Sequence, residues 1–134
     1  MQPTILRHAT LLLICTLLAA CATLKDRMDL LEQAQRDYAG AVRWGHLDGA
    51  YAMHRNADGT APTPAPRLSN YKVTSYLVLS RSVAKDKTGA DQVVEIKYYH
   101  ADFMRESTLT LQQHWRYDAP THTWLVTSPP PDFK

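Results

Sequence analysis

Hydrophobic residues between positions 22 and 44 recur every three or four residues, with charged residues between them. This spacing places the hydrophobic side chains on one face of a helix and the charged ones on the opposite face. The pattern therefore predicts an amphipathic helix over residues 22–44. Gly45 is expected to end it, because glycine accepts the left-handed conformation found at helix ends. The predicted buried stripe consists of Leu24, Met28, Leu31, Ala34 or Gln35, Tyr38 and Val42.

A second, shorter helix is predicted over residues 47–54, with Asp48 as its candidate N-cap. Residues 55–67 follow it and contain three prolines at alternate positions. Proline lacks the amide donor that helices and central strands need, so this segment is predicted to be a loop.

Beyond Leu68 the hydrophobic period changes to alternation, which is the pattern of strands that bury one face. Four segments show it, and the short connections between them require antiparallel hairpins. The four predicted strands are residues 71–80, 92–100, 106–117 and 123–128. In the first strand, the residues expected to share the buried face are Tyr71, Val73, Ser75, Leu77 and Leu79.

These elements predict an α+β fold. A helix with one hydrophobic stripe and a sheet with one hydrophobic face are both satisfied when the two faces are buried together. We therefore expect a long N-terminal helix and a short second helix packed on a four-stranded antiparallel sheet, forming a single domain over residues 24–134.

The N-terminus carries a separate signal. A hydrophobic run without charge, residues 9–20, follows Arg7 and ends at Cys21. Twelve helical residues span about 18 Å, which is less than the roughly 30 Å of a bilayer core, so the run fits the apolar region of a secretory signal. The four residues at its end are Leu18, Ala19, Ala20 and Cys21.

This tetrapeptide resembles the lipobox of bacterial lipoproteins. The resemblance implies cleavage between Ala20 and Cys21 and acylation of Cys21, so that residues 1–20 are a removed signal peptide and residues 21–23 a lipidated tether. Acyl chains on Cys21 then anchor the protein to a membrane. An ordinary signal peptide cut near Ala20, with Cys21 unmodified, is the alternative.

The residue after the lipobox predicts the final location. An aspartate after the cysteine commonly retains such lipoproteins in the inner membrane, and Ala22 stands there instead. For a Gram-negative organism, this implies anchoring to the outer membrane, facing the periplasm. Because Cys15 leaves with the signal peptide and Cys21 is acylated, the mature chain is expected to have neither a free thiol nor a disulfide.

The charge of the chain is nearly balanced. The whole chain has a formal net charge of +2, and removing residues 1–20 removes Arg7 and no acidic residue, which leaves +1. Nucleic-acid-binding proteins usually show a marked basic excess, so we expect no nucleic-acid partner.

The predicted third and fourth strands and the turn between them resemble the nuclear transport factor two-like superfamily. The matching residues are Trp115, Tyr117, Asp118 and Trp124, in the segment HWRYDAPTHTWLVTSPPPDF. The segment YAGAVRWGHLDGAYAM, predicted to form a helix, a glycine break and a short helix, also resembles that superfamily. The resemblance implies a sheet curved around the long helix, often with a conical pocket. A cystatin-like fold remains the alternative.

Such a pocket provides one candidate site. Its candidate lining residues are Tyr38, Tyr98, Gln113, Trp115, Tyr117 and Trp124. The inward polar residue, Gln113, does not titrate, and no catalytic motif of the superfamily's enzymes matches the chain. The five histidines after Cys21 lack metal-ligand spacing, so we expect no metal and no cofactor.

The outer sheet face provides a second candidate site. Its candidate partner-binding residues are Tyr76, Val78, Val93 and Tyr99. Hydrophobic residues that gather on an exposed face often mark a partner surface. The leading hypothesis is a membrane-anchored, non-catalytic binding or assembly module of the periplasm, pairing as a homodimer or with another envelope protein. The alternative is a small-molecule-binding protein, or an isomerase- or dehydratase-type enzyme, that uses the pocket between helix and sheet.

Overall fold

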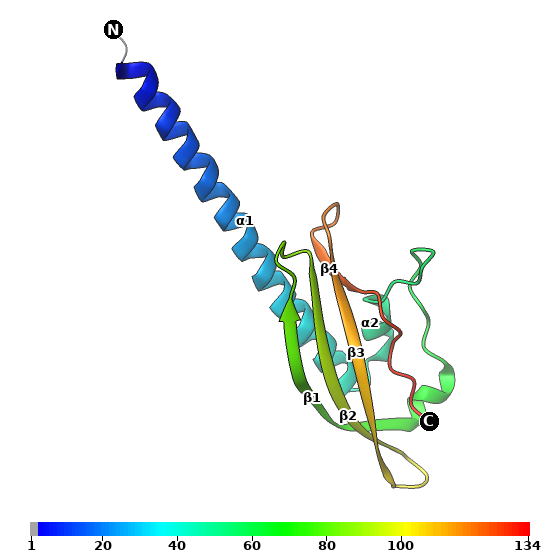
Figure 1. The fold of residues 1–134 in the computed structure, drawn as a ribbon. Helices are drawn as coiled ribbons and strands as arrows, with labels where there is room; N and C mark the ends of the chain where they lie inside the picture. The colour runs from blue at the N-terminus through cyan, green and yellow to red at the C-terminus, as the bar shows by residue number, and fades with distance from the viewer. Residues whose placement is uncertain (1–2) are drawn as a thin grey trace.

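A computed structural model describes the backbone of residues 3–134 and the side chains of residues 23–134. The fold is α+β, with one long helix lying across one face of a four-stranded antiparallel sheet (Figure 1). The helical elements are α1 (Pro3–Arg43), α2 (Leu47–Ala52) and the 3₁₀ helix η1 (Pro66–Asn70). The strands are β1 (Tyr71–Val83), β2 (Gly89–His100), β3 (Glu106–Asp118) and β4 (Thr123–Val126).

Helix α1 ends before Gly45, as its sequence predicted. Gly45 has a φ of 75°, and the N–H groups of Gly45 and His46 donate to the carbonyls of Val42 and Ala41 at 3.3 and 2.8 Å. This pair of bonds is the Schellman arrangement, which satisfies carbonyls left free at a helix end. The prediction that Asp48 caps α2 is wrong, because His46 holds the cap position and Asp48 lies inside the first turn.

The sheet is a meander with the spatial order β1-β2-β3-β4, and every neighbouring pair is antiparallel. The outer edge of the short strand β4 is covered by the segment that follows α2. Val126 donates to the carbonyl of Met53 at 2.9 Å and accepts from the N–H of Arg55 at 2.8 Å. At the other edge lies β1, which is 13 residues long.

Two register shifts in β1, between Val73 and Ser75 and between Val78 and Ser80, change which side chains face the core. A β-bulge adds one residue to one strand, so the alternation of faces reverses beyond it. Our assignment of faces in this strand is therefore wrong from Ser75 to Leu79, and the predicted alternation returns at Ser80, beyond the second shift. Tyr76 and Val78 pair with the buried residues Ile96 and Val94 and lie on the inner face, although Val78 is still 36 % exposed. Leu77 and Leu79 are each 52 % exposed.

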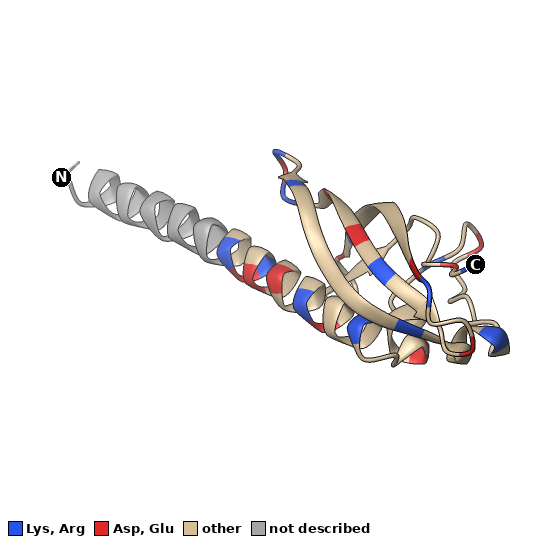
Figure 2. Cartoon of the chain, turned by 90° about the horizontal axis from the view of Figure 1, so that it is seen from below, with Lys and Arg blue, Asp and Glu red and all other residues tan. Residues whose placement is uncertain are grey.

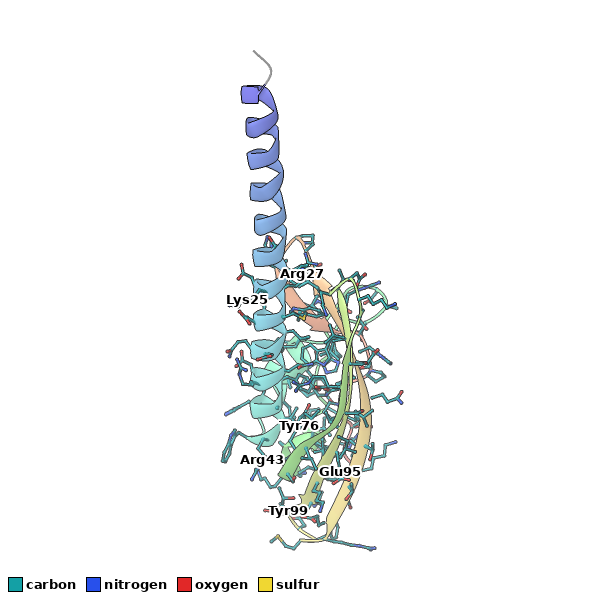
Figure 3. All side chains as sticks on the ribbon, turned by 60° about the vertical axis from the view of Figure 1, so that its left-hand side comes forward. Lys25, Arg27, Arg43, Tyr76, Glu95 and Tyr99 are labelled. Atoms are coloured by element: carbon teal, nitrogen blue, oxygen red, sulfur yellow. The ribbon has the colours of Figure 1, made fainter. Side chains whose placement is uncertain are left out.

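The core lies between α1 and the concave inner face of the sheet, and Figure 3 shows Tyr76 in this space and Glu95 on the opposite face. The helix contributes Leu31, Gln35, Tyr38 and Val42, which confirms most of the predicted stripe. Leu24 is exposed, and it lies about one helical turn before Arg27, whose carbonyl accepts a hydrogen bond from Trp124 of the sheet. The sheet contributes mainly Val73, Ala90, Val94, Ile96, Tyr98, Trp115, Trp124 and Val126.

The C-terminal segment closes the end of the core that lies farthest from residue 21. The hydroxyl of Tyr51 donates to the carbonyl of Pro131 at 2.7 Å, and Arg67 pairs with Asp132 and donates to the carbonyl of Phe133 at 2.5 Å. Phe133 is 1 % exposed, and its ring centroid lies 4.7 Å from that of Tyr98. The tail is therefore a packed part of the domain.

We predict that Phe133→Ala lowers the free energy of unfolding by about 3 kcal/mol, because it removes a buried aromatic side chain and leaves a cavity. Chemical denaturation followed by tryptophan fluorescence measures the change. The matched control is Phe103→Ala, since Phe103 is 76 % exposed and its truncation should change stability by no more than about 0.5 kcal/mol. Equal effects of the two substitutions would contradict the role given to the tail.

Candidate functional site

A chain of hydrogen bonds crosses the interior where α1 meets the sheet. The Tyr38 hydroxyl and Nε2 of His54 are 2.8 Å apart, and Nδ1 of His54 lies 2.8 Å from the carbonyl oxygen of Ser128. A carbonyl only accepts, so Nδ1 carries the proton and Nε2 accepts from Tyr38. Both ring nitrogens of His54 are thus occupied, and the histidine joins α1 to the C-terminal segment.

Amide side chains form a second part of this interior layer. Gln92 donates to Oε1 of Gln113 at 2.6 Å, and the Tyr76 hydroxyl donates to the same oxygen at 3.2 Å. Gln35, one helical turn before Tyr38, is 4 % exposed. Among the described residues, neither amide atom of Gln35 has a hydrogen-bond partner, and the same holds for Nε1 of Trp115. The interior is therefore polar at its centre and not uniformly hydrophobic.

The titratable groups of this layer stay neutral. Burial, and more weakly the neighbouring tyrosines, raises the pKa of Tyr38 far above its usual range. Burial also raises the pKa of Tyr76 to about 12, and it lowers the pKa of His54 despite the opposing bond to Ser128. The phenols therefore act only as hydrogen-bonding groups near neutral pH. The imidazole is uncharged, and its one basic nitrogen is already engaged by Tyr38.

The structure separates the candidate pocket residues along the core. Gln113 and Trp115 lie at its centre beside Tyr38, while Tyr98 lies at one end against Phe133. At the other end, Tyr117 is half buried beneath the guanidinium of Arg27, 4.4 Å from the ring centroid, and contacts Trp124. The six side chains therefore do not line one common pocket.

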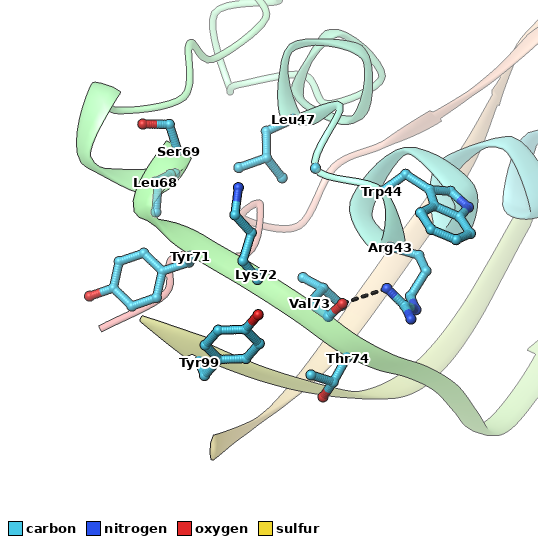
Figure 4. Close-up of a pocket in the computed structure, with 11 residues that line it drawn as sticks. Arg43, Trp44, Leu47, Leu68, Ser69, Tyr71, Lys72, Val73, Thr74 and Tyr99 are labelled. Carbon is cyan, nitrogen blue, oxygen red and sulfur yellow. Dashed lines mark hydrogen bonds between the residues drawn. The ribbon is translucent and has the colours of Figure 1, made fainter. Parts of the chain in front are cut away.

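A groove of about 560 Å³ lies on the surface where α1 ends and β1 begins (Figure 4). Arg43 donates to the carbonyl oxygen of Val73 at 2.5 Å, which satisfies a backbone group at the free edge of the sheet. Its guanidinium lies 5.0 Å from the ring of Trp44, a side chain that is 72 % exposed. Lys72 and Tyr99 form part of the opposite wall.

The local fold explains why these side chains meet. The Schellman turn at Gly45 stops α1 immediately after Trp44, so the indole projects beyond the helix instead of packing in the core. Lys72 and Tyr99 are paired residues of β1 and β2 on the outer face. Sequence reasoning missed Arg43, Trp44 and Lys72 as site residues. The available signal was the tryptophan directly before the glycine, outside the predicted stripe.

The four candidate partner-binding residues do not form one surface. Tyr76 and Val78 lie on the inner face, as described above, because the bulge reverses the alternation. Val93 and Tyr99 face outward, and only Tyr99 belongs to the groove. Most side chains on the outer face of β3 are polar, namely Glu106, Thr108, Thr110, Gln112, His114 and Arg116.

Acidic residues and histidines contact one another only in pairs in the described part of the chain. His114 lies 2.5 Å from Asp91, and His100 lies 3.8 Å from Asp102. Among the residues with described side chains, no group of three histidine, cysteine, aspartate or glutamate residues is arranged to hold a metal ion.

The lipobox residues, Leu18 to Cys21, lie outside the residues whose side chains are described. Helix α1 runs through residues 21–23, and the division of the chain into signal peptide, tether and domain stays a prediction. Within the described residues, no helix has both the length and the hydropathy needed to cross a membrane.

No protein-family model matches this sequence, and neither a curated protein nor a solved structure is significantly similar to the chain.

We predict that the free energy of unfolding falls as the pH drops below about 6.5, the ordinary pKa of histidine. The folded protein holds the pKa of His54 below that value. Between the two pKa values, the unfolded chain binds a proton that the folded chain does not, which favours unfolding by at most about 1.4 kcal/mol per pH unit. Above pH 6.5, this contribution to stability is complete.

Urea unfolding at pH 7.5, 6.0 and 5.0 measures this dependence. His54→Gln should lower stability at pH 7.5 and flatten the dependence between pH 6.5 and 5.0. His46→Gln is the matched control, because His46 is exposed and its replacement should leave the dependence unchanged. A pH dependence that survives in His54→Gln would rule out His54 as its source.

Proposed function

We propose that this protein is a lipoprotein anchored through Cys21 to the outer membrane, and that its domain is a non-catalytic binding module in the periplasm. The lipobox at Leu18–Cys21 supports the anchor. The groove beside Trp44 supports binding as the activity and is the site at which we place the partner.

The direction of α1 supports this arrangement. From Cys21 to Arg43 the helix rises about 33 Å, at about 1.5 Å for each of 22 residues. The groove lies at the far end of this helix, beyond most of the domain (Figure 1). A chain held at Cys21 therefore presents the groove away from its own membrane, toward other proteins of the periplasm.

The exposed tryptophan is the observation that carries the binding proposal. Tryptophan and arginine are enriched among the residues that contribute most to protein–protein affinity. Here Trp44 is 72 % exposed, and Arg43 lies against its ring at the rim of a groove. The proposal that the domain is non-catalytic is supported by its interior, where the titratable side chains are neutral and already hydrogen-bonded.

The order of elements supports a relationship to nuclear transport factor two-like domains. Helix, glycine break, short helix and antiparallel meander follow one another as in that superfamily, and the sheet bends on the side that faces the helix (Figure 1). The likeness stays a prediction, with the cystatin-like fold as its alternative, and the proposed activity does not depend on the choice between them.

We predict that Cys21→Ala abolishes acylation and releases the protein from the membrane fraction, because no sulfur remains to carry the diacylglycerol. Metabolic labelling with palmitate, combined with fractionation of cells, measures both effects. Cys15→Ala is the matched control, since Cys15 lies in the segment predicted to be removed, and it should label and fractionate like the original chain. Unchanged labelling of Cys21→Ala would refute the anchor.

We predict that a photo-cross-linking amino acid placed at position 44 captures a protein partner in cells. The control is the same amino acid at position 103, because Phe103 is equally exposed but lies outside the groove. An adduct at position 44 alone supports the groove, and its mass separates a second copy of this chain from another envelope protein. Identical adducts at both positions, or none, would contradict the assignment.

A further inference from the structure

Two turns of the sheet lie at the same end of the domain as residue 21. The chain passes along α1 toward the groove, returns along β1, and turns through residues 84–88 before β2; the turn between β3 and β4 lies at the same end (Figure 1). The groove and the turn between β2 and β3 lie at the opposite end.

Arg27 connects α1 to the two strands that flank the β3–β4 turn. Its backbone carbonyl accepts a hydrogen bond from Nε1 of Trp124 at 2.9 Å, and its guanidinium lies over the ring of Tyr117. Tyr117 and Trp124 flank the β3–β4 turn. In the β1–β2 turn, hydrogen bonds from Thr88 lower the pKa of Asp86, and the charge of Arg27 adds a smaller effect in the same direction. The β3–β4 turn therefore lies level with Arg27, and the β1–β2 turn lies at the same end of the sheet (Figure 1).

The distance from this level to the proposed anchor is short. Six helical residues separate Cys21 from Arg27, which corresponds to about 9 Å along the axis. The headgroup region on each side of a bilayer is about 5–8 Å thick, half the difference between the hydrocarbon core and the full bilayer. Acyl chains on Cys21 would enter the hydrocarbon, so the turns would lie close to the outer limit of the headgroups.

The β1–β2 turn carries suitable side chains for this position. Asp86 is folded back, accepting the N–H of Thr88 at 3.0 Å, between Lys85 and Lys87. The exposed Lys85 has a long flexible side chain with an ammonium group that binds phosphate. Figure 2 shows basic residues at this tip and along the nearby part of α1, where the exposed Leu24 also lies.

Acidic residues at this end limit the contribution of charge. The basic groups are Lys25, Arg27, Lys85 and Lys87, and the acidic groups are Asp26, Asp29, Asp86 and Asp118. Since the two sets balance, net charge alone does not bring this end to a membrane. Proximity enforced by the anchor is what makes the lysines effective, because a tethered group meets its target at a high local concentration.

We propose that the β1–β2 turn, residues 84–88, is a second membrane contact, with Lys85 and Lys87 at the phosphates of the phospholipids that surround the acylated Cys21. This inference rests on the proposed anchor. The contact restricts tilting of α1, and it thereby holds the groove beside Trp44 at a defined distance from the membrane.

The test uses the full-length acylated protein in vesicles of phosphatidylethanolamine and phosphatidylglycerol. If Cys21 is acylated and Cys15 is removed, a cysteine introduced by Ala84→Cys is the only thiol and takes a fluorescent label specifically. Headgroup spin-labelled lipid should quench this label at least threefold more strongly than a label at Asp102→Cys, in the turn at the opposite end. Equal quenching at the two positions overturns the inference.

Charge reversal tests whether the two lysines bind the lipid phosphates or the turn only lies close to the membrane. With the label on Ala84→Cys, the double change Lys85→Glu and Lys87→Glu should reduce quenching by about half, and Lys85→Arg with Lys87→Arg should retain it. Unchanged quenching after reversal overturns the role of the lysines. Absence of the acyl mass on Cys21 overturns the anchor and this inference together, whereas acylated, vesicle-bound protein with equal quenching overturns this inference alone.

Discussion

The burial of Tyr38 is the constraint on which the rest of the structure depends. Its side chain is fully buried where α1 crosses the sheet, with its ring against Tyr76 of β1 and Trp115 of β3. A buried phenol hydroxyl needs a hydrogen-bond partner, and His54 supplies it while its other nitrogen bonds Ser128. One residue of α1 thus determines where two strands, the segment after α2 and the C-terminal segment must lie.

The polarity of this interior has a consequence for function. Amides, phenols and one neutral imidazole gather at the centre of the core, and the bonded ones hold each other in place. Gln35 and Trp115 nevertheless keep polar atoms without partners among the described residues. Such a layer makes the relative position of helix and sheet specific, because a shift of one turn would leave more of these groups unpaired. The side chains available to bind another protein, such as Trp44, lie instead at the surface.

The part of α1 between residue 21 and Arg43 separates two surface regions of different chemistry. Near residue 21, the turns of the sheet and the exposed side chains of the helix carry alternating charges. At the other end, Arg43 covers an edge carbonyl of β1, and Trp44 extends over a groove. The two bulges and this arginine also disrupt the open edge of β1, which otherwise invites pairing with a strand of another chain. A rigid helix keeps these two regions apart.

The sequence by itself determined the elements and their order, because hydrophobic spacing and Gly45 are local properties that report helix, break and strand directly. It therefore predicted the α+β fold, the burial of Leu31, Tyr38 and Val42, and the inward position of Gln113. The candidate lipid anchor at Cys21 is likewise a local motif. Only the tertiary structure decided the faces of β1, because a bulge depends on how one strand pairs with the next. It also decided the groove, since Trp44, Lys72 and Tyr99 are distant in sequence and meet only when α1 packs across the sheet.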